Sequence, residues 1–254
     1  MSEQPVTAGQ PPVEKMSFMD KAAGIFYEPS RVFESFRTDG VKTADWLVPL
    51  LILAVIASLG TYVRFTTPDL RFQFIQMQEQ RIDKSVNEGK ITAEQAQQAK
   101  DRMGSSSGLF MVFGILGAVV GLFIIFFLTA AVWLLVGKYA LKGTAMTYNH
   151  AMAIAGTTSW IAAVGAILGI VIAIAMSRFY GGMNLGMLTQ MNNDNKVYVL
   201  LRSIDLFTVW NLAASAIGIS VLAGKKGEQP YVWVFGIWLV IILFSTFVLG
   251  GMFA

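Results

Sequence analysis

Catalysis or metal binding in this chain would depend on very few residues. The sequence contains one histidine, His150, which follows Asn149, and it contains no cysteine. One histidine cannot form the HExxH zinc motif, and general acid–base catalysis needs positioned partner groups. No glycine-rich loop ends in the Gly-Lys-Ser/Thr sequence of a phosphate-binding site. We therefore expect no catalytic residue, no metal site and no cofactor, and we interpret His150 as a polar anchor at a helix end.

Asp205 is the most informative carboxylate, because it borders a long apolar run and follows Arg202 by three residues. If a helix begins near Val197, Asp205 lies about two turns inside it, where an unpaired carboxylate costs several kcal/mol. If the helix begins near Ile204, Asp205 lies in the first turn, where the helix dipole favours a negative charge. The second position is favoured. Arg202 lies three residues earlier on the same helical side, and this spacing permits an interfacial ion pair with Asp205.

Three methionines, Met183, Met187 and Met191, recur at intervals of four residues. On one face of a short helix their thioethers could bind Cu(I), which prefers soft ligands. No histidine or cysteine lies among them, and methionine commonly fills gaps in packing. Packing is therefore the expected role.

The composition indicates a membrane protein. Of 254 residues, 55% are hydrophobic and 14% are charged, whereas soluble domains have about 25% charged residues. Basic residues are scattered and the net charge is only +3, so no nucleic-acid partner is expected. The predicted fold is all-α, a polytopic bundle of five transmembrane helices. Five apolar runs reach the roughly 20 residues that a spanning helix needs: 46–66, 108–136, 150–176, 204–223 and 231–253.

Residues 1–45 are predicted to be a cytosolic tail followed by amphipathic helices, and residues 46–254 to be the five-span membrane domain. In the first region, apolar residues recur at helical spacing on both sides of Pro29, which indicates two short amphipathic helices. These helices either lie in the membrane interface or pack against the spans. The sequence pattern fits both arrangements.

The segment 67–107 is a polar insertion after the first span. It contains Gly89, and Thr92 is followed three residues later by Gln95, which is the spacing of a capping box. A helical hairpin outside the bilayer is therefore predicted. Its balanced charges fit a solvated surface or an arm that docks a partner.

Small residues recur at intervals of four in the second and third spans. Helices in lipid associate by close backbone approach, which small residues permit. We expect packing inside the bundle, with a seam between two copies of the chain as the alternative. The residues are Gly117 and Gly121, then Gly165, Gly169 and Ala173.

The orientation follows from the short connections. Lys and Arg number nine in the connections on each side of the membrane. The two shortest connections, GKYALKGT and AGKKGEQP, each carry two lysines and lie on the N-terminal side. Short loops weigh most in the positive-inside rule, so we expect a cytosolic N-terminus and an external C-terminus.

The run IDLFTVWNL contains Asp205, Phe207 and Trp210 and precedes GISVLAGKK, while EPSRVFESFR contains Pro29. With five spans and a polar insertion after the first, these segments resemble the Yip family of Ypt/Rab-interacting membrane proteins, in its bacterial branch, over about 25–254. The resemblance implies an integral membrane protein with a cytosolic N-terminus. Eukaryotic relatives act in ER–Golgi trafficking with small GTPases, and some bacterial relatives accompany ABC transporters. The sequence departs from the eukaryotic DLYGP-type pattern, so Rab binding is not carried over.

Two functional hypotheses follow. The first is a non-enzymatic adaptor or assembly factor in the bacterial cytoplasmic membrane, which contacts lipids, other integral membrane proteins or a second copy of itself. The second is a transporter, channel or lipid-handling protein, and a membrane enzyme ranks last. A polar cavity that joins Asp205 to His150 would favour the second hypothesis, and a dry, close-packed bundle would favour the first. The residues expected in a polar cluster near Asp205 are Arg202, Asn211, Asn149 and His150.

Overall fold

The computed structural model describes residues 15–105, 107–192 and 195–248. The regular structure of these residues is helical, and the all-α prediction is confirmed. In chain order the elements are α1 (Phe18–Gly24), α2 (Pro29–Thr38), α3 (Thr43–Thr66), α4 (Pro68–Asn87), α5 (Ala93–Ser105), α6 (Ser107–Leu135), the π-helical turn η1 (Val136–Ala140), α7 (Tyr148–Ala175), the 3-10 turn η2 (Leu185–Leu188), α8 (Lys196–Ser203), α9 (Leu206–Ala223) and α10 (Gln229–Phe247).

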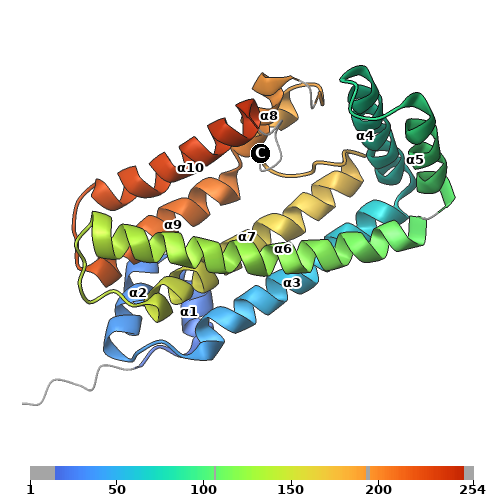
Figure 1. Ribbon diagram of the computed structural model, residues 1–254. Coiled ribbons are helices and arrows are strands. Elements are labelled where there is room, and N and C mark those ends of the chain that lie inside the picture. Colours follow the sequence, from blue (N-terminus) through green and yellow to red (C-terminus); the bar gives the residue numbers. More distant parts are fainter. Residues whose placement is uncertain (1–14, 106, 193–194, 249–254) are drawn as a thin grey trace, which may run out of the picture.

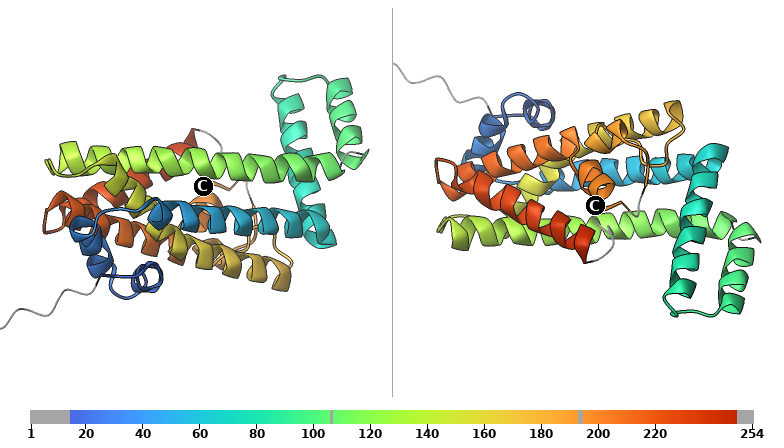
Figure 2. Two further views of the ribbon diagram at one scale, coloured as in Figure 1. Left: turned by 90° about the horizontal axis from the view of Figure 1, so that it is seen from below. Right: turned by 90° about the horizontal axis from the view of Figure 1, so that it is seen from above.

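Five helices are long and apolar enough to cross a bilayer: α3, α6 continued by η1, α7, α9 and α10. They confirm the five predicted spans. The helices run alongside one another, with α1 and α2 at one end of the bundle and the α4–α5 hairpin at the other (Figures 1 and 2). We call these the α1–α2 end and the hairpin end. The chain enters the bundle through α3 at the α1–α2 end, and α10 runs from that end toward the hairpin end (Figure 1).

At the centre of the bundle, α7 packs against α3, α6 and α9. A Cβ added to Gly156 would lie 2.3 Å from the Cα of Trp46 in α3, and one added to Gly165 would lie 2.7 Å from the Cβ of Phe207 in α9. Gly169 and Ala173 face the backbone of Gly181. The helices α3, α7 and α9 therefore pack so closely that a larger side chain at Gly156 or Gly165 would push them apart.

The other small-residue pair lies elsewhere. A Cβ on Gly117 or Gly121 would meet no atom within 4 Å. The pair therefore lies outside the helix contacts of the bundle, in contrast to the expected internal packing. The reason is that α6 touches its neighbours along only part of its surface, and only 6% of its most apolar stretch is fully buried.

The two predicted amphipathic helices are α1 and α2, and Pro29 is the first residue of α2. Their apolar stripe packs against the spans. Ile25, Val32 and Phe33 are fully buried, and the Phe33 ring fits against Gly218 of α9. The structure thus has the second of the two arrangements that the sequence allowed.

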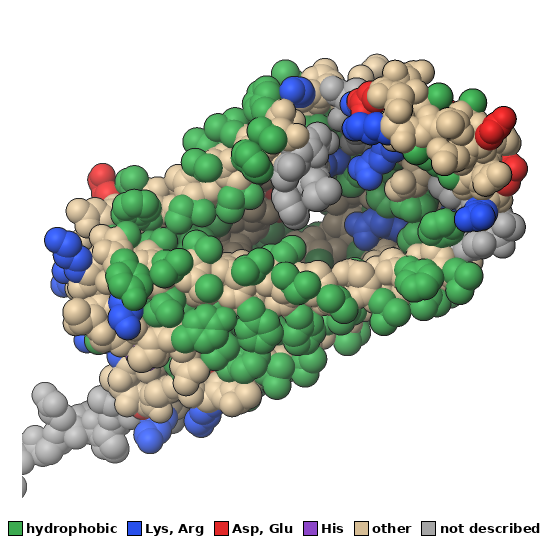
Figure 3. Space-filling view, in the orientation of Figure 1, with side chains coloured by type: hydrophobic (Ala, Val, Ile, Leu, Met, Phe, Trp, Pro, Cys, Tyr) green, Lys and Arg blue, Asp and Glu red, His purple; other side chains and the backbone are tan. Residues whose placement is uncertain are grey.

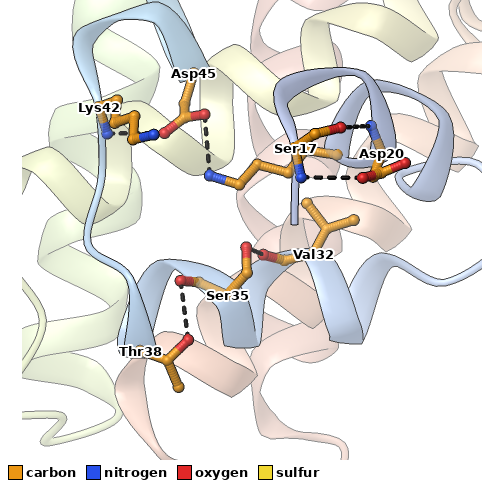
Figure 4. Close-up of polar contacts among 8 residues, drawn as sticks. Ser17, Asp20, Val32, Ser35, Thr38, Lys42 and Asp45 are labelled. Atoms are coloured by element: carbon orange, nitrogen blue, oxygen red, sulfur yellow. Dashed lines mark hydrogen bonds and ion pairs between the residues drawn. The ribbon is translucent and has the colours of Figure 1, made fainter. Parts of the chain in front are cut away.

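A buried ion pair connects α1 to the first turn of α3 (Figure 4). Lys21 Nζ lies 3.1 Å from Asp45 Oδ1, and the two side chains are 6% and 4% exposed. The other oxygen, Asp45 Oδ2, accepts a hydrogen bond from the backbone N–H of Lys42 at 2.8 Å. The ammonium also lies 4.5 Å from the centre of the Phe36 ring in α2. One lysine therefore joins α1, α2 and α3.

The predicted helical hairpin is confirmed as α4 and α5. The turn between them contains Gly89, whose φ of +68° favours a residue without Cβ. The predicted capping box is present: the Thr92 N–H donates to Gln95 Oε1 at 3.0 Å, and the Gln95 N–H donates to Thr92 Oγ1 at 3.2 Å.

The hairpin is fixed to the connection that follows α7. Gln73 of α4 donates from Nε2 to the carbonyl of Ser177 at 2.6 Å and accepts from the N–H of Phe179 at 2.9 Å. The Ser177 hydroxyl donates to Asp69 Oδ2 at 3.0 Å. These contacts hold α4 against residues 177–179.

The same connection contains the three methionines. Its helical part, η2, is a four-residue 3-10 turn that includes Met187 but neither Met183 nor Met191. The short helix that would align the three thioethers is therefore not formed.

Candidate functional site

Asp205 lies at the break between two helices. It is the N-cap of α9, and its Oδ1 accepts hydrogen bonds from the N–H groups of Phe207 at 2.9 Å and Thr208 at 3.1 Å. The preceding helix, α8, ends at Ser203. The first alternative, one helix from Val197 with Asp205 two turns inside, is therefore wrong. Asp205 caps the helix just before its first turn, close to the favoured alternative.

The break also changes the position of Arg202, which belongs to α8 and not to the helix of Asp205. The argument from spacing within one helix therefore does not apply to this pair. The guanidinium of Arg202 lies 4.1 Å from the ring centre of Tyr180 and 5.9 Å from that of Tyr198. Burial raises the pKa of the Tyr198 phenol above its ordinary value, against a smaller opposing effect of Arg202.

The connection after α7 folds back onto this break. The Leu185 N–H donates to the Ile204 carbonyl at 3.1 Å, and the Leu206 N–H donates to the Met183 carbonyl at 3.0 Å. The two bonds form an isolated antiparallel bridge between Asn184 and Asp205. Asn184 is thereby placed beside Asp205, 21 residues ahead of it in the chain.

A cavity of about 650 Å³ lies between α3, α6, α7, α9 and residues 181–184, and we call it the central cavity. The side of the bundle is hollowed between α6 and the α9–α10 pair, with Lys or Arg side chains toward the hairpin end of the hollow (Figure 3). The polar residues that line the central cavity are Thr61, Arg64, Asn184, Asp205, Thr208 and Asn211, and its apolar residues include Ile56, Ala57, Ala118, Ala162, Ile170 and Leu212.

Arg64 is the residue of this site that the sequence reasoning missed. It lies two residues before Thr66, the last residue of α3, inside a predicted span. Its Nε donates to the carbonyl of Phe179 at 3.3 Å. Its Nη1 lies 3.1 Å from a Cβ built on Gly60, one turn earlier, so the guanidinium folds back along α3 into the bundle. The available signal was a charge inside an apolar run, which in membrane spans marks a functional position by default.

Asn211 lies one α-helical turn and a half beyond Asp205 on α9 and lines the same cavity. Its Nδ2 donates to the carbonyl of Thr158 in α7 at 2.8 Å. Asn211 also lines a smaller cavity of about 160 Å³ beside α6. That cavity contains Trp133, whose buried indole N–H has no hydrogen-bond partner among the residues that the structure describes.

His150 and Asn149 lie far from this site, in the first turn of α7 at the α1–α2 end. The Thr147 N–H donates to His150 Nδ1 at 3.3 Å, and the His150 N–H donates to the Thr147 hydroxyl at 3.3 Å. His150 is therefore part of a capping box. Neither residue lines the central cavity, so the expected polar cluster is divided between the two ends of the bundle.

The aromatic residues near Asp205 have packing contacts. Phe207 fills the space left by Gly165, and its ring lies 6.3 Å from that of Trp210. Trp210 in turn meets Phe26 edge to face at 5.6 Å. The rings of Phe207, Trp210 and Phe26 thus connect the wall of the central cavity to the segment between α1 and α2. In the run IDLFTVWNL, Asp205 therefore contacts the connection after α7, and Trp210 contacts the segment between α1 and α2.

The polar end of the cavity lies near the hairpin end of the membrane spans. Gly169, which faces residues 181–182, is six residues before the end of α7, or about 9 Å at 1.5 Å per residue. The 28 residues of α7 correspond to about 42 Å, longer than the roughly 30 Å of hydrocarbon. With α7 centred in the bilayer, Arg64, Asn184 and Asp205 lie near the boundary between the headgroups and the hydrocarbon, and the apolar walls extend toward the middle of the bilayer.

Comparison with known proteins agrees with the resemblance in the sequence. The family model of the Yip1 domain matches residues 23–249. A search of curated proteins and a search of solved structures gave no significant match. The matched segment includes α2, all five spans, the hairpin and the central cavity. The chain is an integral, multi-pass membrane protein that belongs to the Yip1 domain family.

Proposed function

We propose that this chain is a non-enzymatic membrane protein that takes a membrane amphiphile into its central cavity from the side. The observation that carries the proposal is the cavity itself, about 650 Å³ in volume, with the charged residues Arg64 and Asp205 near its hairpin end. This is the lipid-handling form of the second hypothesis. The cavity includes Asp205 and Asn211 but ends short of His150.

The shape of the cavity favours an amphiphile over a water-soluble solute. Its charged residues, Arg64 and Asp205, lie near the hairpin end of the spans, and Ile56, Ala118 and Leu212 line the part nearer the middle of the bilayer. Ligand pockets of 300–1,000 Å³ typically combine apolar walls with a few placed polar groups. A lipid that entered through the hollow side of the bundle would keep its chains among apolar groups and its headgroup among polar ones.

The non-enzymatic part of the proposal is supported by the separation of the reactive groups. His150 Nδ1 and Asp205 Oδ1 each accept a backbone hydrogen bond that caps a helix. General acid–base catalysis needs such groups close to a partner. The two lie at opposite ends of the bundle.

Filling the cavity tests the proposal. Ala118→Trp places a large side chain where α6 lines the central cavity, and Val120→Trp places the same side chain on an outward position of α6 that is 56% exposed. We expect Ala118→Trp to lose lipid retained through purification in mild detergent, as measured by native mass spectrometry. Val120→Trp should retain it. Equal retention by both variants and the unchanged protein would refute binding in the cavity.

An adaptor role is the second candidate, and the exposure of α6 favours it. Much of the surface of α6 faces away from the other described helices, and Gly117 and Gly121 lie open on this surface. Small residues on an open helix permit close approach of a second helix, from another integral membrane protein such as an ABC transporter or from another copy. The Gly165 contact is filled by Phe207 and does not offer this surface.

Cross-linking after replacement of Gly117 and Gly121 by leucine tests the adaptor role. Loss of a co-purified membrane protein or of a homo-oligomer, with folding unchanged, would support it. Leucine at the outward Val120 position is the matched control. If the same partners are recovered with every variant, α6 is not the docking helix.

A further inference from the structure

The central cavity is lined by two opposite charges that do not pair with each other. Arg64 comes from α3 and Asp205 from the start of α9. Among the residues that the structure describes, neither forms an ion pair within 4 Å. A lone charge at membrane depth is costly, and such charges ordinarily pair with one another or mark a ligand path. Two unpaired charges of opposite sign in one cavity therefore require a ligand or water that solvates both.

Each charge has atoms that are open to the cavity. Arg64 uses Nε for the carbonyl of Phe179 at 3.3 Å, and no described residue accepts a hydrogen bond from its two Nη atoms. Asp205 uses Oδ1 for the N–H groups of Phe207 and Thr208, and within the described chain its Oδ2 has no donor. Oδ2 lies 3.5 Å from a Cβ built on Gly182, so the absence of a side chain there leaves room beside the carboxylate.

We propose that the central cavity selects an amphiphile with a zwitterionic headgroup that contains a phosphate and a primary ammonium group. This inference rests on the proposed function. The phosphate would bind the Nη atoms of Arg64, because the planar guanidinium matches phosphate oxygens in a two-bond geometry. The ammonium would donate to Asp205 Oδ2. The amides of Asn184 and Asn211 line the same space and supply further donors and acceptors.

The primary ammonium is favoured over a quaternary one. Quaternary ammonium groups are typically held by cages of several aromatic rings. Phe207 is the one aromatic residue in the described lining of the central cavity, and its ring is packed against Gly165. A carboxylate oxygen without a donor instead suits an ammonium that carries N–H groups. Phosphatidylethanolamine has this chemistry, and phosphatidylcholine and phosphatidylglycerol each lack one part of it.

The experiment uses the full chain in nanodiscs that contain equal amounts of phosphatidylethanolamine, phosphatidylcholine and phosphatidylglycerol. Lipids that stay bound on release are identified by native mass spectrometry. We expect about tenfold enrichment of phosphatidylethanolamine, the selectivity that one charge-assisted hydrogen bond provides. Asp205→Asn should abolish this preference while lipid is still bound, because asparagine caps helices as well as aspartate does. Arg64→Gln should reduce the binding of all three phospholipids.

Glu94→Gln is the control, since it removes one negative charge from the exposed first turn of α5, outside the cavity. It should leave the enrichment unchanged. Bound lipid without a headgroup preference, or a preference that survives Asp205→Asn, would overturn the inference and leave the proposed function standing. If the unchanged protein holds no lipid that Ala118→Trp displaces, both the inference and the proposed function are overturned.

A final arm separates a lipid from a free solute with the same headgroup. Water-soluble glycerophosphoethanolamine is added at millimolar concentration to detergent-purified protein. If it binds as tightly as the lipid, the apolar walls contribute nothing and the ligand is not an amphiphile. At equal concentration, we expect glycerophosphoethanolamine to displace less than a tenth of the bound phosphatidylethanolamine that lipid in micelles displaces. The reason is that burial of the acyl chains adds to the affinity of the lipid.

Discussion

At the residue scale, four charged residues in or near the bundle serve two different roles. Lys21 and Asp45 pair at 3.1 Å and are almost completely buried. Arg64 and Asp205 line open space and meet backbone groups instead. Lys21 and Asp45 therefore pair with each other, whereas Arg64 and Asp205 each keep hydrogen-bonding atoms that no described residue uses. Of these four residues, Arg64 and Asp205 are therefore the ones suited to bind a ligand.

The Lys21–Asp45 pair should be required for stability. Asp45→Ala leaves a buried ammonium without its partner, and such a loss costs about 3–5 kcal/mol. The double variant Lys21→Met/Asp45→Asn should recover most of the stability, because asparagine can still accept from the Lys42 N–H. Thermal unfolding in detergent measures the difference. A single variant as stable as the unchanged protein would show that the pair contributes little.

Gly165 and Gly117 should respond in opposite ways to the same substitution. Gly165→Ala forces a Cβ to within 2.7 Å of Phe207, and overpacking of this kind costs about 1–3 kcal/mol. Gly117→Ala meets open space and should stabilise the protein by up to about 1 kcal/mol, because alanine favours the helix more than glycine does. Unfolding of the two variants in one detergent makes the comparison. Equal effects would contradict the α7–α9 contact.

At the element scale, the short helices at the α1–α2 end depend on local capping as well as on packing. In α1, the Ser17 N–H donates to Asp20 Oδ2 at 3.0 Å, and the Asp20 N–H donates to the Ser17 hydroxyl at 3.1 Å (Figure 4). The hydrogen bonds from the Ser17 hydroxyl and backbone lower the pKa of Asp20 below its ordinary 3.8. The carboxylate form is thus the one that supports the helix start.

The capping of α1 should therefore weaken in acid. Because the folded-state pKa is lowered, the stabilisation is complete at pH values well above 3.8 and is lost as the pH falls through the folded-state value. Hydrogen exchange at the α1 amides should quicken in this acidic range, after correction for the intrinsic pH dependence. Asp20→Asn should show faster exchange already at neutral pH. If α1 in Asp20→Asn exchanges like the unchanged protein at pH 7, packing alone holds the helix.

Elements that depend on local signals were predictable from the sequence. The Thr92–Gln95 spacing predicted the start of α5, and the apolar runs predicted the five spans. The position of Arg64 in the site was not predictable, because the cavity is closed by residues 181–184, which fold back from a connection more than 100 residues later. The separation of His150 from Asp205 was deducible. They begin consecutive spans, which run in opposite directions, so they must lie at opposite ends.

At the scale of the whole molecule, the short connections between spans differ in their basic residues. The two short lysine-containing connections, which include Lys142 and Lys226, both lie at the α1–α2 end. Lys and Arg near spans are retained on the cytosolic side. We therefore propose that the α1–α2 end faces the cytosol and that the hairpin and the polar end of the central cavity face the outside.

Single cysteines test this orientation without interference, since the chain has none of its own. In intact cells that produce the protein, a membrane-impermeant maleimide should label Glu94→Cys on the hairpin. Lys226→Cys, between α9 and α10, should react only after the membrane is permeabilised. The reverse pattern would invert the orientation. Labelling of both from one side would contradict a hairpin and an α9–α10 turn on opposite faces.

The carboxamide of Gln73 has a mechanical consequence. It clamps α4 to the backbone at Ser177 and Phe179, and Phe179 also receives the Arg64 hydrogen bond. A pull or tilt imposed on the hairpin by anything that grips it would be transmitted through two peptide groups to the guanidinium. The hairpin is thus mechanically connected to the Arg64 side chain through the backbone of residues 177–179.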